Sequence, residues 1–308
     1  MTTESAIDAG GSTRGARAGT RRVRLGALLG AVIVLVTTAC THQPVPRSAA
    51  PGGDPAFGAD VRVAACRDAL AAAHAAGGAG LDGAGIRVLN WNVQKKHGSA
   101  WRQDFDRLTT GADLVLIQEA SLGHHADPGL AAGRHATFAP GYRSGRGVTG
   151  VLTLSRNEPL VSCSFTTREP WLRTQKSTGI TAYALAGSDE TLAVVNLHAV
   201  NFALGLSDYR AQFARVLEVL QDHAGPIILA GDFNTWRGQR LAVVTELASA
   251  LELRAVSFAD DERVRFFGRP LDHIYVRNLE LRQSGTDSVT TSDHNPMTAV
   301  LAMPFVAP

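Results

Sequence analysis

Lysine, cysteine and aromatic residues are all scarce in this chain of 308 residues. Only three of its 30 basic residues are lysine, it has three cysteines, and aromatic residues make up 6% of the sequence. Three cysteines without a CxxC pair exclude a cysteine-rich zinc module and a small disulfide scaffold. The 45% hydrophobic and 19% charged content is typical of a globular protein, which excludes a disordered chain and a pure coiled coil.

A basic surplus is also absent from most of the chain. The net charge of +2 comes from residues 1–24, where five arginines face two acidic residues, because the remainder has 25 basic and 26 acidic residues. A protein that holds duplex DNA by neutralising many phosphates usually carries a basic surplus. The composition therefore disfavours this mode of binding, although it is compatible with local basic patches.

Residues 1–40 have the organisation of an export signal. An apolar segment, Leu25–Val36, follows the arginine cluster and leads into Thr37-Thr38-Ala39-Cys40. A helix of this length covers about 18 Å, well short of the roughly 30 Å hydrocarbon core of a bilayer. The segment is therefore interpreted as a signal peptide rather than as a membrane-spanning helix.

The end of this signal resembles a bacterial lipoprotein box, in which the cysteine becomes the lipidated first residue of the mature chain. The resemblance implies a lipid anchor on Cys40 and an extracytoplasmic protein tethered to the cell membrane. Thr37 stands where such boxes usually have a leucine-like residue. Simple cleavage with secretion and an uncleaved anchor therefore remain alternatives.

The rest of the chain divides by composition into three parts. Residues 41–60 are rich in proline, glycine and alanine and are expected to form a flexible tether. Residues 61–85 predict an alanine-rich leader helix followed by a glycine-rich linker. Residues 86–308 are expected to form the main domain.

Cys66 and Cys163 are the two remaining cysteines if Cys40 carries a lipid. In an oxidising compartment they can form a disulfide. The alternative is a pair of buried thiols, and the sequence leaves both open.

Apolar runs of strand length alternate with helical patterns from Ile86 onward. Several runs are apolar throughout, which is typical of strands buried on both faces in a layered α/β architecture. A helix is expected over Asp208–His223, where four apolar residues share one face. The expected strands are Ile86–Val93, Ala112–Gln118, Thr149–Ser155, Ile180–Leu185, Thr191–Val200, Pro226–Ala230, Leu271–Val276 and Met297–Met303.

Polar residues stand at the ends of these apolar runs at five places. Carboxylate and amide oxygens are hard ligands, which suit Mg²⁺ or Mn²⁺ better than zinc. Such a recurrence is not explained by solvated strand ends, and it predicts one convergent site. The polar groups are Asn90 with Asn92, Glu119, Asn196 with His198, Asp232 with Asn234, and Asp272 with Asp293 and His294.

In chain order, the motifs WNV, QEA, NLHAV, GDFN, LDH and SDH resemble those of the endonuclease/exonuclease/phosphatase superfamily. That superfamily includes DNase I-like nucleases, abasic-site endonucleases, bacterial sphingomyelinases and inositol-phosphate phosphatases. The resemblance covers residues 86–303. It implies an α/β (α+β) four-layer sandwich of DNase I-like fold, with two packed mixed β-sheets flanked by helices, and it makes residues 86–308 the catalytic domain.

The resemblance also implies the ligands of a metal ion and the groups that activate water. Asn92, Glu119 and Asp293 are expected to hold Mg²⁺, for which Mn²⁺ can substitute. Asp232 and Asn234 are expected to orient or deprotonate the attacking water and to hold the phosphate.

Two histidines carry the remaining roles in the reaction. His294 resembles the catalytic histidine of the superfamily and Asp272 its carboxylate partner, since such a pair keeps the imidazole oriented and cationic. His198 is a candidate general acid.

Phosphate contacts are expected between the third and fourth apolar runs. Arg168-Glu169-Pro170 resembles a segment of DNase I-like nucleases whose arginine approaches substrate phosphate. Arg173 and Lys176 lie close by in the sequence, and Arg168, Arg173 and Lys176 are the candidate phosphate ligands.

The expected activity is metal-dependent hydrolysis of phosphodiester bonds by an exported, membrane-tethered monomer. A nuclease is the leading interpretation, and a phospholipid or headgroup phosphodiesterase of the sphingomyelinase type, or an inositol-phosphate phosphatase, is the alternative. A non-catalytic binding protein on the same scaffold is the alternative of another class. It predicts loss of at least one motif residue, and none is lost.

Overall fold

The computed structural model describes residues 43–44, 59–75, 79–94, 99–122, 128–144, 147–203 and 205–304. The chain divides into two units, Met1–Cys40 and Thr41–Pro308, and all described residues belong to the second. The expected export signal and its Cys40 thus lie outside the described residues. Within the part of the chain that the structure describes, no helix has the length and apolar character needed to cross a membrane.

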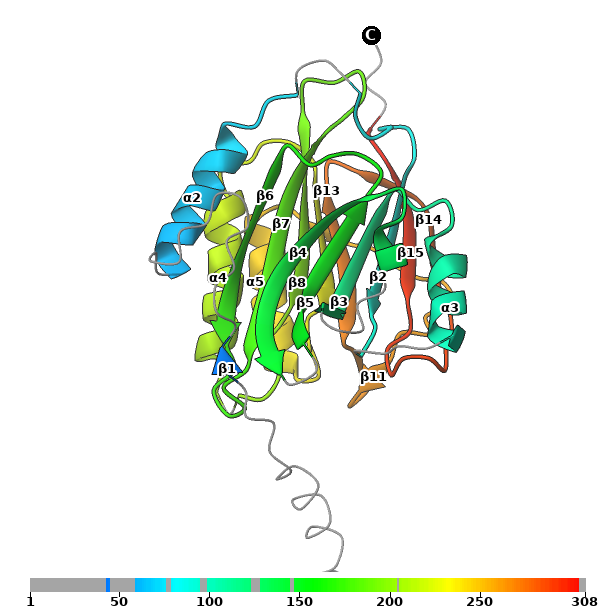
Figure 1. Ribbon diagram of the computed structural model, residues 1–308. Coiled ribbons are helices and arrows are strands. Elements are labelled where there is room, and N and C mark those ends of the chain that lie inside the picture. The colour runs from blue at the N-terminus through cyan, green and yellow to red at the C-terminus, as the bar shows by residue number, and fades with distance from the viewer. Residues whose placement is uncertain are drawn as a thin grey trace, which may run out of the picture. The chain divides into compact units, whose positions relative to one another are not determined.

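Two mixed β-sheets form the centre of the second unit (Figure 1). The first sheet has the strand order β1-β4-β5-β3-β2-β15-β14, and the second has the order β10-β13-β9-β8-β7-β6. Parallel pairs, β2 with β3 and β8 with β9, lie inside each sheet among antiparallel neighbours. The strands of the first sheet are β1 (Gln43–Pro44), β2 (Ile86–Asn92), β3 (Leu114–Leu122), β4 (His135–Ser144), β5 (Gly147–Ser155), β14 (Glu280–Thr286) and β15 (Met297–Ala302). Those of the second are β6 (Val161–Arg168), β7 (Gln175–Ala184), β8 (Thr191–His198), β9 (Ile227–Asp232), β10 (Arg254–Ala255) and β13 (Asp272–Arg277), and β11 (Arg265–Phe266) pairs with β12 (Arg269–Pro270) in a separate hairpin.

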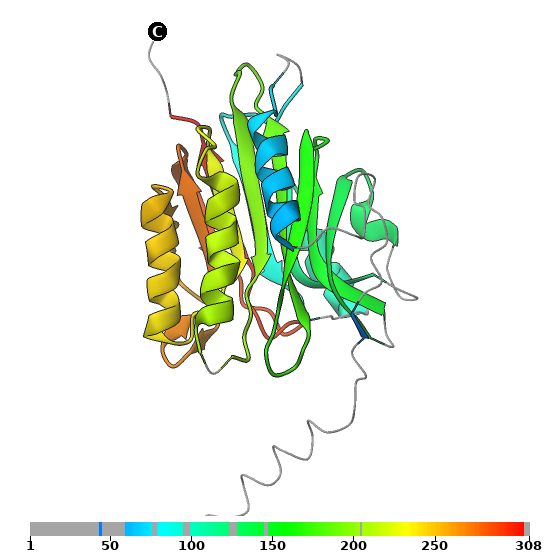
Figure 2. The same cartoon turned by 90° about the vertical axis from the view of Figure 1, so that its left-hand side faces the viewer.

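Helices cover the outer faces of the two sheets. Figure 2 shows α2 (Ala59–Ala71), α4 (Ser207–Leu220) and α5 (Gly238–Ala250) over the second sheet. On the opposite side, α3 (Ser99–Thr109) packs on the first sheet, and a short 3₁₀ helix, η1 (Pro128–Ala131), follows β3. The result is the predicted four-layer α+β sandwich, which is confirmed.

Three apolar clusters hold these layers together. Phe213 of α4 and Phe233 belong to the cluster between the second sheet and its helices. Leu116 and Ile228 lie in the cluster between the two sheets, and Trp91 lies in the cluster between the first sheet and α3. Burial of each such side chain contributes about 1.5–3 kcal/mol. The helices and both sheets are therefore fixed against one another by burial of apolar surface.

The elements expected from the sequence are present, with shifted ends. Each of the eight expected strands forms, and the expected helix at 208–223 is α4. The tether and leader helix differ from expectation, because Gln43–Pro44 pair with β4 and α2 already begins at Ala59. α2 also ends at Ala71, before the glycine-rich linker. Leu70 is its last buried residue, and the following turn is closed by a hydrogen bond from the Ala73 N–H to the Leu70 carbonyl.

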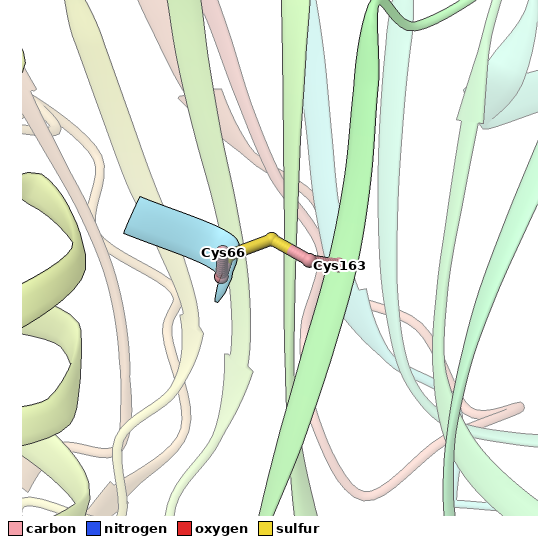
Figure 3. Close-up of a disulfide and its surroundings, with 2 residues drawn as sticks. All are labelled: Cys66 and Cys163. Carbon is pink, nitrogen blue, oxygen red and sulfur yellow. A yellow bond between two sulfur atoms is a disulfide. The ribbon is translucent and has the colours of Figure 1, made fainter. Parts of the chain in front are cut away.

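A disulfide joins the leader helix to the second sheet (Figure 3). It links Cys66 of α2 with Cys163 of β6, which are separated by 97 residues in the sequence. Of the two alternatives that the sequence left open, the structure contains the disulfide.

Strand direction brings the polar strand ends to one end of both sheets. The carboxyl ends of β2, β3, β8 and β9 lie there, together with the amino ends of β13 and β15. We call this the active-site end, and it is the lower end in Figure 1, where β1 and β11 also lie. The polar motifs that are far apart in the sequence therefore meet in space.

Candidate active site

Register alone aligns three of the predicted residues across neighbouring strands. His198 is the Cα partner of Asp232 in the parallel β8–β9 pair, and Asp272 is the partner of Asp232 in the antiparallel β9–β13 pair. Asn92 closes β2 of the facing sheet and reaches the same carboxylate. The site is thus built on rigid strand ends rather than on long loops.

The Asp232 carboxylate is the centre of the cluster. Its Oδ2 accepts hydrogen bonds from Nδ2 of Asn92 at 3.0 Å and from Nδ2 of Asn234 at 3.2 Å, and its Oδ1 accepts the Asn234 backbone N–H. Nε2 of His198 lies 3.5 Å from Oδ2 and Nε2 of His294 lies 3.9 Å from it. Burial raises the Asp232 pKa to about 6, with Asp272 adding to the shift and His294 opposing it.

Asp272 and His294 form a short, buried pair. Nδ1 of His294 and Oδ2 of Asp272 are 2.6 Å apart, so the imidazole presents Nε2 toward Asp232. Burial opposes protonation of His294, but the carboxylates of Asp272 and Asp232 outweigh it and raise the His294 pKa to about 10. The imidazole is therefore cationic at neutral pH.

The backbone is left-handed at Glu119 and Asn234, and both side chains lie beside the cluster. Glu119 has a φ of 56° at an irregularity in the β3–β5 register, and a bulge of this kind re-aims a strand side chain. Its Oε1 lies 3.9 Å from Nε2 of His198. Asn234 has a φ of 51°. Such conformations cost on the order of 1–3 kcal/mol each and are concentrated at functional sites.

Gly231 allows β8 and β9 to approach closely beside the site. Its φ is 151°, and a Cβ atom at this position would lie 1.8 Å from the Leu197 carbonyl oxygen. Any side chain there would push the two strands apart. The spacing of His198 and Asp232 therefore depends on this glycine.

Lys176 is the one predicted phosphate ligand that contacts the cluster among the described residues. Its Nζ lies 2.9 Å from Nε2 of His198. The lysine side chain thus reaches the imidazole that the sequence predicts to be a general acid. Arg168 and Arg173 are instead exposed, in and just after the carboxyl end of β6.

Asp293 stands apart from the other predicted site residues because it is exposed. It accepts a hydrogen bond of 2.5 Å from Nε2 of Gln94. Its loop is fastened to β2, since the Ser292 hydroxyl donates to the Asn92 carbonyl and the Trp91 indole N–H donates to the His294 carbonyl. These bonds fix the position of His294 as well.

The oxygen ligands of the site fit a hard divalent cation. Among the described residues, the metal-capable side chains whose ligand atoms all lie within 4.8 Å of one another are Asp232, Asp272 and His294. The short bond between Asp272 and His294 already uses an oxygen and a nitrogen of that group, which favours an acid–base pair over a metal site. Glu119 and Asn92 offer carboxylate and amide oxygens beside Asp232, a set that suits Mg²⁺. The ligand set of Asn92, Glu119 and Asp293 stays a prediction.

Two residues below the site were not assigned a role from the sequence. Gln118 and Asn196 are fully buried between the sheets, and Nε2 of Gln118 donates to Oδ1 of Asn196 at 2.7 Å and to Oδ1 of Asn90 at 2.9 Å. Nδ2 of Asn196 donates to the Leu152 carbonyl. This network links both sheets directly beneath Glu119 and His198. A lone amide at the end of an otherwise apolar run is the signal that could have revealed it.

Comparison with known proteins places this geometry in context. A sequence profile of the Endonuclease/Exonuclease/phosphatase family matches residues 89–294. A UPF0294 protein of Vibrio campbellii is 37% identical over 214 residues, which cover 69% of this chain and 76% of that protein. An endonuclease/exonuclease/phosphatase family protein from Leptotrichia buccalis superposes with a TM-score of 0.57 at 16% identity, covering 71% of this chain and 100% of that one. The human nocturnin catalytic domain with bound sulfate has a TM-score of 0.56 at 20% identity, covering 73% and 96%.

Proposed function

The chain belongs to the endonuclease/exonuclease/phosphatase family and is a phosphoesterase, and we propose that it is an exported, membrane-tethered monomer that hydrolyses phosphodiester bonds with the help of Mg²⁺ or Mn²⁺. The observation that carries the proposal is the buried Asp272–His294 pair directed at Asp232. Glu119 and His198 lie beside that pair at the same end of the sheets. This arrangement supplies a proton acceptor, fixed positive charge and oxygen ligands in one place.

The metal ion would be held by Glu119, Asn92 and Asp293, and when bound it would neutralise charge on a phosphoryl oxygen and polarise the phosphorus. The remaining work falls to side chains of this chain. Fixed positions matter most, because phosphoryl transfer is accelerated mainly by orientation and charge stabilisation.

Asp232 is suited to orient and deprotonate the attacking water. Its raised pKa of about 6 makes the carboxylate a stronger base than an exposed aspartate while leaving it ionised near neutral pH. Asn92 and Asn234 hold it by two side-chain hydrogen bonds and one from the backbone. The carboxylate is therefore presented in a single orientation.

His294 and Lys176 supply positive charge near the position of the phosphate. Imidazolium and ammonium groups both stabilise the charge that develops on non-bridging oxygens. His198 contacts Lys176, and we expect it to act as the general acid once the lysine turns to the substrate phosphate. A phosphate that attracts Lys176 would produce this change.

The chemistry of the cluster is common to several substrates. A nuclease is the first candidate, as the sequence predicts. A lipid phosphodiesterase is favoured by one specific observation, the exposed apolar side chains around the active-site end, which are treated in the next subsection. Both candidates share the same bond cleavage.

A hydrolysis panel tests the proposal. The 41–308 chain, which contains every described element, is incubated with Mg²⁺, Mn²⁺ or a chelator and with plasmid DNA, RNA, sphingomyelin, inositol phosphates and bis-nitrophenyl phosphate. We expect metal-dependent release of product from at least one diester. Undiminished hydrolysis in the chelator, or hydrolysis of none of these substrates, would contradict the proposal.

Glu119→Gln refines this test at the metal site. The change replaces an anionic oxygen ligand with a neutral one of nearly the same shape, so it should weaken metal affinity rather than the chemistry. We expect activity to fall at low Mg²⁺ and to recover partly in excess metal. Glu190→Gln, on the exposed turn between β7 and β8 at the other end of the sheet, is the matched control and should leave the metal dependence unchanged.

A further inference from the structure

Exposed apolar side chains are concentrated at the active-site end. The described residues include seven large hydrophobic side chains that are exposed, and five of them lie in loops or in the β11–β12 hairpin at this end. Phe267, Trp171 and Phe202 are exposed to 73%, 61% and 50%, respectively. The five are Trp171, Leu172, Phe202, Phe266 and Phe267. A gathering of this kind around a site is unusual for a soluble surface and indicates an interaction face.

These side chains belong to three segments, residues 169–174, 199–203 with 205–206, and 264–271. Together with residues 233–237, which pack against them, we call these segments the apolar rim. The rim contains four arginines, Arg173, Arg237, Arg265 and Arg269, and a single acidic residue, Glu169. All four arginines are exposed and Glu169 is only 1% exposed, although Arg265 forms an ion pair with Asp261 just outside the rim. The surface that the rim presents is therefore both apolar and cationic, although the catalytic domain as a whole has no basic surplus.

Hydrogen bonds fasten the segments of the rim to one another. Oε1 of Glu169 accepts the backbone N–H groups of Asn201 and Phe202 at 2.7 and 2.9 Å, and Oε2 accepts the Thr174 hydroxyl. The Trp236 indole N–H donates to Oδ1 of Asn201, and the Trp236 ring packs edge-on against Phe266. The loops that carry the exposed apolar side chains are therefore held in place by hydrogen bonds and ring packing.

The described chain also begins at this end. Gln43 and Pro44 of β1 pair with Arg143 and Tyr142, at the carboxyl end of β4. That end of β4 lies with the carboxyl end of β3 and the Glu119 side of the first sheet, because β5 pairs antiparallel with both strands. A segment that runs N-terminally from β1 therefore starts from the same end as the apolar rim.

We propose that the apolar rim docks on a lipid bilayer with anionic headgroups, so that the active site faces the bilayer and acts on phosphodiesters of membrane lipids. Tryptophan, phenylalanine and leucine insert at the headgroup level, and arginines beside them attract anionic lipid. The docking proposal depends only on the composition and position of the apolar rim. The identity of the substrate rests in addition on the proposed phosphodiesterase activity.

Two features favour lipid over nucleic acid as the occupant. Leu172 offers no π-face on which a base could stack, yet it is exposed beside Trp171. Sequence-independent binding of nucleic acid also requires a cationic groove along many phosphates, whereas the rim places its four arginines between apolar side chains. An apolar face with scattered cations matches the boundary between headgroups and acyl chains.

Vesicle flotation of the 41–308 chain tests docking without any need for activity. The probe is vesicles of equal parts phosphatidylglycerol and phosphatidylethanolamine, with phosphatidylcholine vesicles as the uncharged comparison. We expect the wild type to float with the anionic vesicles and to be released partly by high salt. Absence of wild-type binding would overturn the proposal, whatever the hydrolysis panel shows.

A matched pair of double variants assigns the binding to the rim. Trp171→Ala/Phe267→Ala removes its two most exposed side chains, and Leu160→Ala/Leu281→Ala removes two exposed leucines at the opposite end of the sheets. We expect at least tenfold weaker vesicle binding for the first and a change within twofold for the second. Equal loss in both variants, or in neither, contradicts docking through the rim.

Fluorescence gives a readout that does not depend on weakened binding. Trp171 is far more exposed than Trp91 and Trp101, which are 1% and 6% exposed. Brominated phospholipid should quench wild-type emission, and Trp171→Leu should bind equally well with less quenching, because only the half-buried Trp236 then remains in the rim. If quenching is unchanged in Trp171→Leu, or if single-stranded DNA binds through the rim while vesicles do not, the proposal is wrong.

Discussion

Asp232 combines deep burial with an unusually large number of polar neighbours. Each of its oxygens accepts at least one hydrogen bond, and two imidazoles lie within 4 Å of Oδ2. Burial nevertheless raises its pKa, so the ionised form costs stability at neutral pH. The Asp232 carboxylate therefore serves the reaction rather than the stability of the fold.

Asp232→Asn should reduce the hydrolysis rate to below about a tenth, a loss of roughly 1.4 kcal/mol or more in transition-state stabilisation. The amide cannot accept the proton of water, and excess metal should not restore the rate. The unfolding midpoint is measured alongside, because the variant removes a buried charge but also places an amide N–H group where Asp232 accepts a hydrogen bond. Asp189→Asn, on the exposed β7–β8 turn, is the control. If Asp232→Asn keeps more than about a tenth of the wild-type rate, the general base lies elsewhere.

The Asp272–His294 pair should be visible in a pH titration. The His294 pKa is raised from 6.5 to about 10, so its contribution to stability is fully present below about pH 6.5 and is lost as pH rises through about 10. Asp272→Asn removes one of the two carboxylates and should lower this pKa, which NMR of the imidazole measures. A wild-type His294 that titrates near its unperturbed value would contradict the assigned pair.

Residue identity predicted the cluster well, because metal-dependent phosphate chemistry requires few side-chain types. Asp232, Asp272 and His294 were recognised from their motifs and meet in the structure. The left-handed backbone at Glu119 was beyond the sequence, because it depends on the irregular register between β3 and β5, which no local pattern encodes. The amide bridge from Gln118 to Asn196 was indicated only by lone amides in apolar runs, since the pairing itself depends on how β3 and β8 of the two sheets oppose each other.

At the scale of elements, the strands at the centre of each sheet were predictable and the outer ones were not. Every residue of β8 and β9 is buried, so both read as continuous apolar runs. The outer strands β4 and β6 mix exposed, half-buried and buried positions without strict alternation, and β14 has no buried position. Without a regularly buried face, the sequence lacks the period of two on which strand prediction depends.

The link between α2 and β6 is the element-scale feature that is easiest to test. The Cys66–Cys163 disulfide closes a segment of 97 residues, and disulfides typically contribute about 2–4 kcal/mol to the free energy of unfolding, mainly by restricting the unfolded chain. The double variant Cys66→Ser/Cys163→Ser should lose this amount in denaturant titration. A reductant should lower the stability of the wild type but not that of the variant, whereas two alkylatable thiols in unreduced, exported protein would refute the crosslink.

For the molecule as a whole, the active site, the proposed docking surface and the first described strand lie at the same end of the two sheets. The site lies where both sheets terminate, the apolar rim lies at the same end of the second sheet, and β1 begins there. If the enzyme is held at a membrane by its N-terminus, its active site would therefore face the bilayer. The opposite end, with Leu160 and Leu281, carries no comparable group of aromatic side chains among the described residues.

A lipid on Cys40 is the prediction that concerns the whole chain, because it determines where the enzyme works. The apolar segment of the signal is too short to span a bilayer, so stable attachment requires the lipid together with a second signal, and the apolar rim supplies one. Cells that express the wild type or Cys40→Ser are labelled with palmitate and fractionated. We expect a labelled wild type that resists extraction by high salt and an unlabelled Cys40→Ser that salt releases, since only the rim then holds it. Equal labelling of both proteins, or label in neither, would end the lipoprotein interpretation while leaving the hydrolysis and vesicle experiments to be judged on their own results.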